Sequence, residues 1–225
     1  SNLLSRTDAR GNTERYEYDA LNRQVKTTDA DGKFTEAEYD EVGNLIHRTD
    51  KRGNVTTFDY DALNRRITMT EPDLGIAAGK PVTRYAWDAM GNLVSQTDQL
   101  GQETTFEYDL MGRQTAREDA LGGRVESEYD AVGNVVEQVD ELGRRTVHVY
   151  DDLDRRIKTV QPDPDGLGGA QNAPEQTFTW DARGNSLSRT DARGHTTTYE
   201  YDAMGRMVEV VDAEGEGARS EYDKV

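Results

Sequence analysis

The sequence contains no cysteine, so disulfides and thiolate metal sites are excluded. No apolar run approaches the roughly 20 residues that a membrane-spanning helix needs. Apolar residues make up only 34% of the chain, and the mean hydropathy is −0.91. A thick, two-sided hydrophobic core is therefore not expected. Disorder is the weaker interpretation because Tyr, Val, Ile, Phe and Thr recur in phase, which favours a thin sheet with one modestly apolar face.

Positive charge is also scarce, since 27 basic residues stand against 44 acidic ones and the net charge is −17. Nucleic acid and anionic membranes attract positively charged surfaces, so neither is an expected partner. Many of the aspartates belong to recurring turn motifs, which makes the acidity a by-product of turn chemistry. A Ca²⁺ array is the alternative, but it needs several oxygen atoms converging on each ion. One Asp per turn does not supply them.

What the sequence does contain is a repeated Tyr-Asp dipeptide. Successive copies are 21, 21, 27, 21, 21, 21, 30, 21 and 21 residues apart. Such a period is typical of an array built from one supersecondary unit. We expect a single array over residues 1–225, with about nine full repeats and partial ends that look cut from a longer array. The aromatic residues of the dipeptides are Tyr18, Tyr39, Tyr60, Trp87, Tyr108, Tyr129, Tyr150, Trp180, Tyr201 and Tyr222.

Most repeats also contain two copies of Asp-x-x-Gly, as in Asp88 to Gly91 and Asp98 to Gly101. Asp at the first position and Gly at the fourth predict a type I turn followed by a residue with positive φ. In three copies the Gly is replaced by residue types that tolerate this conformation comparatively well, namely Asn22, Asn64 and Asp154. Two turns are expanded, near residues 72–81 and 162–175, and both are rich in Pro and Gly.

Segments of about six or seven residues rich in Thr, Val, Ile, Tyr and Phe separate the turns, and they predict strands. The expected fold is all-β: antiparallel hairpin repeats of about 21 residues that form a continuous ribbon of about twenty strands. Open sheets of that size twist and curl, so a curled or spiral course is expected. The two terminal strands would be unpaired edges, which invite self-association.

The odd period requires one residue to be absorbed in each repeat, because side chains alternate faces with period two. We expect the Tyr-Asp turn to have four loop residues and the other turn three. Val94 then lies opposite Phe106 on the better-buried face, while glutamates such as Glu107 lie on the other face. The residues equivalent to this pair are Val25, Ile46, Ile67, Val136, Ile157, Leu187 and Val208, with Tyr16, Phe58, Tyr85, Phe178 and Tyr199.

No catalytic, cofactor-binding or metal-binding constellation emerges, so we do not expect an enzyme or a cofactor. The three histidines, His47, His148 and His195, occupy three different positions in the repeat. Ser-His-Asp catalysis would require them to meet an activated Ser, and nothing marks one. The column of tyrosines could stack on sugars, but cross-strand packing is the favoured interpretation.

The unit Tyr-Asp-x-x-Gly-Asn/Arg-Leu, continued by a second Asp-x-x-Gly and Thr-x-Tyr/Phe-x-Tyr-Asp, resembles the Rhs/YD-repeat family. GNLVSQTDQLGQETTFEYD and GNSLSRTDARGHTTTYEYD are similar to its consensus. The resemblance covers the whole chain and implies a spiral β-sheet wall. In bacterial Rhs proteins and toxin-complex components this wall forms a hollow shell around a toxic C-terminal domain. In teneurins a similar shell supports cell-surface recognition.

The resemblance thus implies a structural segment of a polymorphic-toxin shell, with the rest of the shell and an enclosed toxin as partners. It also implies a secreted or cell-surface bacterial protein that is delivered by a secretion system. Asp163-Pro164-Asp165-Gly166-Leu167 has the form of the family's shell-terminating motif, but it lies in an expanded turn and is interpreted as a Pro/Gly turn. The alternative function is an aromatic-repeat module that binds carbohydrate or cell-wall ligands, or one that acts in cell-surface recognition.

Overall fold

A computed structural model describes residues 2–73, 75, 79–166 and 172–223. The chain divides into two compact units: unit 1 comprises Ser1–Gly112 and Asp119–Leu121, and unit 2 comprises Arg113–Glu118 and Gly122–Val225. The described residues form twenty strands and no helix. The prediction of an all-β fold made of antiparallel hairpin repeats is confirmed. A curled or spiral course of the ribbon stays a prediction.

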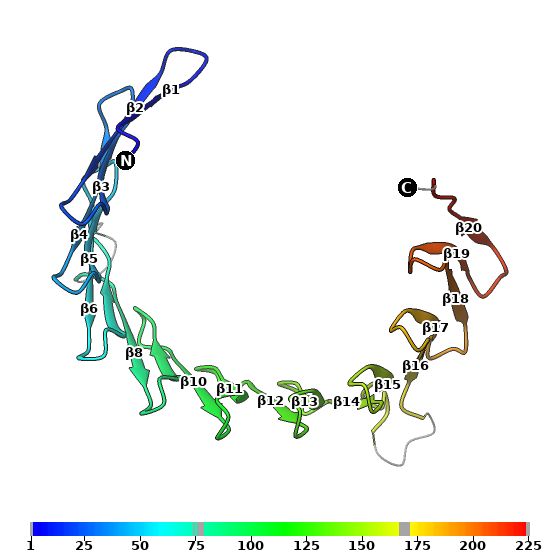
Figure 1. Cartoon of the computed structure of the whole chain (residues 1–225). Helices are drawn as coiled ribbons and strands as arrows, with labels where there is room; N and C mark the ends of the chain where they lie inside the picture. The colour runs from blue at the N-terminus through cyan, green and yellow to red at the C-terminus, as the bar shows by residue number, and fades with distance from the viewer. Residues whose placement is uncertain (1, 74, 76–78, 167–171, 224–225) are drawn as a thin grey trace. The chain divides into compact units, whose positions relative to one another are not determined.

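Unit 1 contains the first ten strands, and each strand pairs antiparallel with the next one along the chain (Figure 1). These strands are β1 (Ser5–Thr7), β2 (Thr13–Tyr18), β3 (Gln24–Thr28), β4 (Phe34–Tyr39), β5 (Leu45–Thr49), β6 (Val55–Tyr60), β7 (Arg66–Thr70), β8 (Val82–Trp87), β9 (Leu93–Thr97) and β10 (Glu103–Tyr108).

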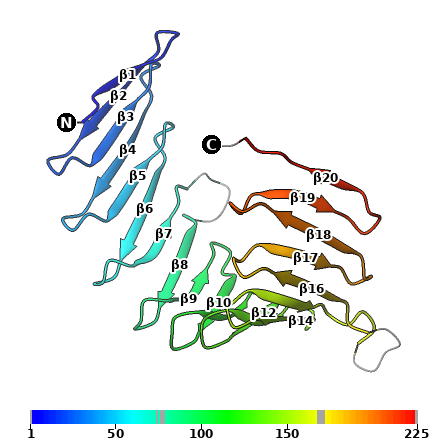
Figure 2. The ribbon, with the colours of Figure 1, turned by 45° about the vertical axis from the view of Figure 1, so that its right-hand side comes forward.

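Unit 2 contains the other ten strands in the same antiparallel order, and Figure 2 shows strands of each unit side by side in chain order. These strands are β11 (Gln114–Glu118), β12 (Arg124–Tyr129), β13 (Val135–Val139), β14 (Arg145–Tyr150), β15 (Arg156–Val160), β16 (Glu175–Trp180), β17 (Ser186–Thr190), β18 (Thr196–Tyr201), β19 (Met207–Val211) and β20 (Gly217–Arg219). Each unit is one layer thick, because its described strands contact only their sequence neighbours.

The turn that follows each Tyr-Asp or Trp-Asp dipeptide is called a YD turn, and the turn at the opposite end of the hairpin is called a second turn. Both types share one geometry. In the YD turn of Asp88, the Asp88 N–H donates to the carbonyl of Asn92 and the Gly91 N–H donates to the carbonyl of Asp88. The second turn at Asp98 repeats these bonds with Gln102 and Gly101. The turn residues at the fourth position have positive φ, including Asn22, Asn64 and Asp154, as predicted.

The prediction that the two turn types differ by one loop residue is therefore wrong. The odd residue is absorbed in a β-bulge on the strand that follows the YD turn, at all eight YD turns whose two strands lie in the same unit. In the β12–β13 pair, Glu128 lies opposite Glu137 while Tyr129 lies opposite Val135, so Val136 is the extra residue. The same register shift occurs in the β8–β9 pair, where Val94 is the extra residue. In a bulge, two residues of one strand lie opposite a single residue of its partner. Equivalent side chains of successive repeats therefore stay on the same face of the sheet although the period is odd.

The two faces of each unit differ in composition. The aromatic face is the side that carries Tyr16, Phe58, Tyr85 and Phe106 in unit 1 and Phe178 and Tyr199 in unit 2; the charged face is the opposite side. Along β10 the side chains alternate between exposed and half-buried, with Phe106 and Tyr108 on the half-buried side. The aromatic members of the predicted face are half-buried or buried, whereas Ile67 and Leu187 at the bulges are exposed.

Very little of the described chain is fully buried. Only Phe58, Thr83, Ala116 and Thr159 fall in that class among the described residues. Phe58, Thr83 and Thr159 lie on the aromatic face by strand alternation and register, and Ala116 lies opposite Glu126 on the charged face. The thin sheet expected from composition is confirmed.

The two expanded turns lie within these units, at second-turn positions. The first connects β7 to β8 and is closed by a hydrogen bond from the Glu71 N–H to the carbonyl of Pro81. The second connects β15 to β16 and is closed by the equivalent bond from Gln161 to Pro174. Residues 74, 76–78 and 167–171, and so Leu167 of the motif that begins at Asp163, lie outside the described residues.

Candidate functional site

The three histidines each have a different local partner. His47 Nδ1 lies 2.8 Å from a Glu38 carboxylate oxygen on the charged face. His148 lies on the aromatic face, where its Nδ1 is 3.1 Å from the Thr159 hydroxyl and burial, followed by Arg156, lowers the pKa of the imidazole. His195 lies in a second turn beside Asp191. None of these contacts forms a nucleophile–base–acid arrangement.

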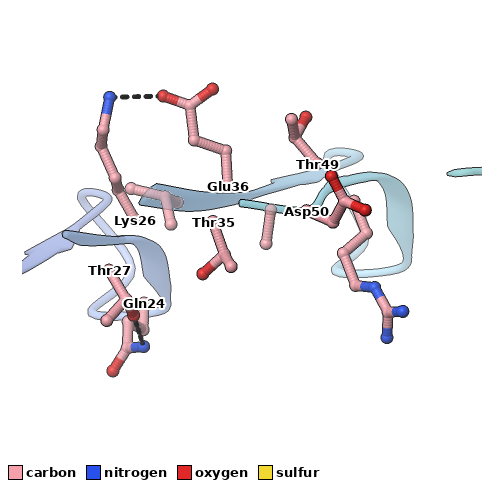
Figure 3. Close-up of a pocket in the computed structure, with 10 residues that line it drawn as sticks. Gln24, Lys26, Thr27, Thr35, Glu36, Thr49 and Asp50 are labelled. Atoms are coloured by element: carbon pink, nitrogen blue, oxygen red, sulfur yellow. Dashed lines mark hydrogen bonds and ion pairs between the residues drawn. The ribbon is translucent and has the colours of Figure 1, made fainter. Parts of the chain in front are cut away.

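Among the described residues, no group of His, Asp and Glu side chains could hold a metal ion, and no helix has the length and apolarity to cross a membrane. A depression of about 320 Å³ lies over β3, β4 and β5 in unit 1. Its lining residues do not converge, because Lys26 and Glu36 project from one side of the ribbon and Gln24 and Thr35 from the other (Figure 3). This depression is not a single site.

The recurring feature of the fold is the hydrogen-bond network of the YD turn. In the turn of Asp61, Oδ1 of the carboxylate accepts the backbone N–H groups of Leu63 and Arg65 at 2.8 and 3.0 Å. Its Oδ2 accepts the Arg65 Nε at 2.7 Å. The Arg65 backbone N–H, followed by its guanidinium, lowers the pKa of the Asp61 carboxyl. The aspartate is thus held as a carboxylate that organises its own turn.

The fifth residue of the YD turn links one repeat to the next. Arg65, which binds Asp61 of its own turn, also donates from Nη1 to the carbonyl of Asp88 at 2.6 Å. Its guanidinium lies over the ring of Trp87, 5.9 Å from the centroid. We call this arrangement the arginine staple. Bonds from the arginine to the next YD turn recur at Arg23, Arg113, Arg155 and Arg206.

Asparagine occupies the fifth position in every other YD turn. Asn44 Nδ2 donates to Asp40 Oδ2 of its own turn and to Asn64 Oδ1 of the following turn. Asn134 makes the equivalent bond to Asp154 at 3.0 Å. The structural period is therefore two repeats. The alternation reads Arg23, Asn44, Arg65, Asn92, Arg113, Asn134, Arg155, Asn185 and Arg206.

The sequence prediction did not include this alternation. Its signal is nevertheless visible in the sequence, because the residue that follows the fourth turn position is alternately Arg and Asn. The sequence prediction correctly placed Tyr at the end of a strand and Asp at the start of the turn. Most of these tyrosines also tie one strand to its neighbour, as when the Tyr60 hydroxyl donates to the carbonyl of Leu45 at 3.0 Å. The dipeptide and the residue four positions after its Asp thus act together as a joint between repeats.

The hairpin period and the YD turns match known families. The RHS Repeat profile matches residues 177–216, and the Teneurin YD-shell profile matches residues 2–161. The chain belongs to the teneurin YD-shell family. Its resemblance to the Rhs/YD-repeat family is thereby confirmed. No curated protein sequence matches this YD-shell chain.

Two solved structures are similar to the YD-shell chain in fold. They are the crystal structures described as TcdB2-TccC3-Cdc42 and TcdB2-TccC3-TEV, each with a TM-score of 0.65 and 17% sequence identity. Each match covers 97% of this chain and 14% of the other chain. The YD-shell chain thus spans about one-seventh of the length of those proteins.

Proposed function

We propose that this chain is a structural, non-enzymatic wall segment of a larger shell that encloses a C-terminal toxin or effector. The observation that carries the proposal is the one-layer architecture: hairpins are joined to their neighbours by staples and bury almost no core of their own. Such a sheet separates two spaces. Its repeated joints suit a mechanical role, and its three histidines and the aspartates that open its turns make local contacts.

The rest of the parent shell is the first proposed partner. In unit 1 the tips of the YD turns carry apolar side chains that are 62–72% exposed: Leu21, Val42, Leu63, Met90 and Met111. One tip occurs per repeat, so the row has a spacing of about 10 Å, twice the distance between neighbouring strands. An exposed apolar row of this kind marks a surface that is covered in the assembled protein. We propose that neighbouring shell segments pack against it.

The location follows from the same proposal. A shell that keeps a toxin away from the cell that makes it is needed in a protein that is exported. We therefore propose a secreted or surface-delivered bacterial parent protein. This proposal rests on membership of the YD-shell family together with the toxin-shell function proposed above.

Limited proteolysis of the longer parent protein tests the wall function. Arg65→Ala and Arg155→Ala together remove two staples, and we expect them to speed protease cleavage of the enclosed C-terminal segment at least tenfold. Arg84→Ala with Arg145→Ala removes the same charge from the charged face and should leave the cleavage rate within twofold of the original. Equal protection in the staple variant would contradict the proposal.

A glycan array separates the wall from the carbohydrate-binding alternative. The 225-residue chain should show no saturable binding to any immobilised glycan or cell-wall fragment. Saturable binding that is lost on Tyr85→Ala and Tyr199→Ala, but kept on Glu107→Ala, would replace the wall function with that of a binding module.

A further inference from the structure

The two faces of unit 2 carry opposite distributions of charge. Strand alternation and register place Arg117, Arg156 and Arg189 on the aromatic face. No Asp or Glu in the described strands of unit 2 lies on the aromatic face. The carboxylates lie on the charged face instead: Glu118, Glu126, Glu128, Glu137, Glu175, Glu200 and Glu209.

Basic residues on the charged face of unit 2 are already neutralised. Arg124 pairs with Glu126 and Glu118, and Lys158 pairs with Glu175 at 2.6 Å. Arg145 pairs with Glu137, and Arg219 pairs with Glu209 at 2.8 Å. Five of the carboxylates of this face, Glu118, Glu126, Glu137, Glu175 and Glu209, therefore have a cationic partner within the sheet.

The arginines on the aromatic face have no such partner. Within the described residues, neither Arg117, Arg156 nor Arg189 forms an ion pair. Arg156 and Arg189 are exposed, Arg117 is half-buried, and the Arg156 guanidinium lies over the Phe178 ring at 5.2 Å. Guanidinium groups that are stacked on aromatic rings and lack a carboxylate keep their donors free for one.

Unit 1 shows the same pattern. Arg48 lies opposite Ala37 on the aromatic face, and the Arg66 guanidinium lies over the rings of Phe58 and Tyr85. Neither arginine forms an ion pair within the described residues. The one carboxylate of that face in the described strands, Glu14, accepts a hydrogen bond from the Tyr16 hydroxyl at 3.0 Å. A chain with a net charge of −17 thus carries a cationic, aromatic face in each of its two units.

We infer that the aromatic face binds an extended polypeptide segment in which carboxylates alternate with aromatic or aliphatic side chains. The arginines offer bidentate donors to the carboxylates, and the rings between them offer apolar contacts. A polypeptide fits better than a nucleic acid. Only some of its residues need be acidic, whereas a nucleic-acid strand carries a phosphate at every nucleotide and meets stronger repulsion from a chain with a net charge of −17. The inference rests on the proposed wall function in one respect: it identifies the face that meets an enclosed chain.

A peptide-binding assay on the 225-residue chain tests this inference. The probe is a fluorescein-labelled peptide with four Glu and four Tyr residues separated by Ser, and its control has Gln at every Glu position. The triple variant Arg117→Gln, Arg156→Gln and Arg189→Gln should bind the Glu peptide at least tenfold more weakly than the unaltered chain. The Gln peptide should bind the unaltered chain at least tenfold more weakly than the Glu peptide does.

A matched variant of the opposite face separates position from net charge. Arg145→Gln, Lys158→Gln and Arg219→Gln remove the same three charges, and this variant should keep peptide affinity within twofold. Circular dichroism should show unchanged strand content in both triples, and Arg→Lys at the three aromatic-face positions should retain part of the binding.

Three results would overturn the inference: equal weakening in the two triples, equal binding of the Gln peptide, or tighter binding of a 12-nucleotide oligothymidylate than of the Glu peptide. The protease assay on the parent protein does not depend on peptide binding, so it tests the wall function separately. Failure of the binding surface and failure of the wall function are therefore distinguishable.

Discussion

At the scale of the residue, backbone conformation decides which positions the fold needs. Gly91 has φ +93°, and no atom lies within 4 Å of the place where a Cβ would stand. A side chain at this position therefore meets no steric clash with a neighbour, and its cost is purely conformational. Gly-to-Val substitution at such a position therefore measures the free-energy cost of the left-handed backbone conformation without a contribution from packing.

We predict that Gly91→Val lowers the free energy of unfolding by at least about 1–2 kcal/mol, because an L-residue with a β-branched side chain resists positive φ. Met90→Val in the same turn is the control, and we expect a change below about 0.5 kcal/mol because Met90 is exposed. Urea denaturation of the two variants measures the difference. Equal midpoints would contradict a turn that requires positive φ at Gly91.

A second prediction at the residue scale compares the adjacent residues Asp151 and Asp152. Asp151 accepts the backbone N–H groups of Leu153 and Arg155, whereas Asp152 is an exposed tip residue. The Arg155 side chain is the largest cause of the lowered pKa of Asp151. A carboxyl whose folded pKa lies below its unfolded value adds stability above the unfolded pKa, about 3.9, and loses it as pH falls through the folded pKa.

Asp151→Asn should therefore destabilise the chain at pH 7, and the difference from the original chain should shrink as the pH falls below about 4. Asp152→Asn is the control at the exposed tip and should unfold like the original chain at pH 7. Thermal unfolding followed by circular dichroism from pH 7 to pH 2 checks both outcomes. A pH-independent difference at Asp151 would mean that its charge plays no part in the turn.

At the scale of the element, sequence periodicity predicted the hairpins well and placed the odd residue wrongly. Alternating strands, Asp-x-x-Gly turns and the aromatic row follow from local rules of side-chain parity and turn chemistry. The bulge at Val136 does not, because a bulge and a longer loop absorb one residue equally well and differ only in cross-strand hydrogen bonds. The staple does not follow from local rules either, because it depends on contacts 17 to 26 residues apart along the chain.

The arginine staple gives the element-scale prediction. Arg65→Ala loses the bond to the Asp88 carbonyl and the contact with Trp87, and we expect a loss of about 1–3 kcal/mol of unfolding free energy. Arg65→Lys should recover less than half of it, because an ammonium cannot reproduce the forked donor geometry. Arg84→Ala on the charged face is the control and should change stability by less than about 0.5 kcal/mol. Full recovery by Lys would show that charge alone matters at this joint.

At the scale of the whole molecule, each strand pairs only with its sequence neighbours, so stability is expected to be distributed along the array. The pairing of β1 and β20 leaves one side of each without a partner in the described residues. Their outward N–H groups can be identified from the alternation of an antiparallel ladder. The Tyr16 N–H donates to the carbonyl of Leu4, and the Ser220 N–H donates to the carbonyl of Val208. Leu4 and Ser220 therefore direct their backbone polar groups toward the neighbouring strand. The N–H groups of the adjacent residues Ser5 and Arg219 point away from the sheet.

Proline at these two outward positions should block edge-to-edge pairing without disturbing the β1–β2 and β19–β20 ladders, because it removes an N–H that the sheet does not use. We predict that the chain self-associates as its concentration rises, and that Ser5→Pro with Arg219→Pro at least halves the associated fraction in sedimentation velocity. Ser5→Ala with Arg219→Ala is the matched control, since it removes the same side chains but keeps both N–H groups, and it should associate like the original chain. If the proline variant associates as much as the original chain, the association does not use the strand edges. The exposed apolar tips of the YD turns, such as Leu21 and Met90, would then be the surface to mutate next.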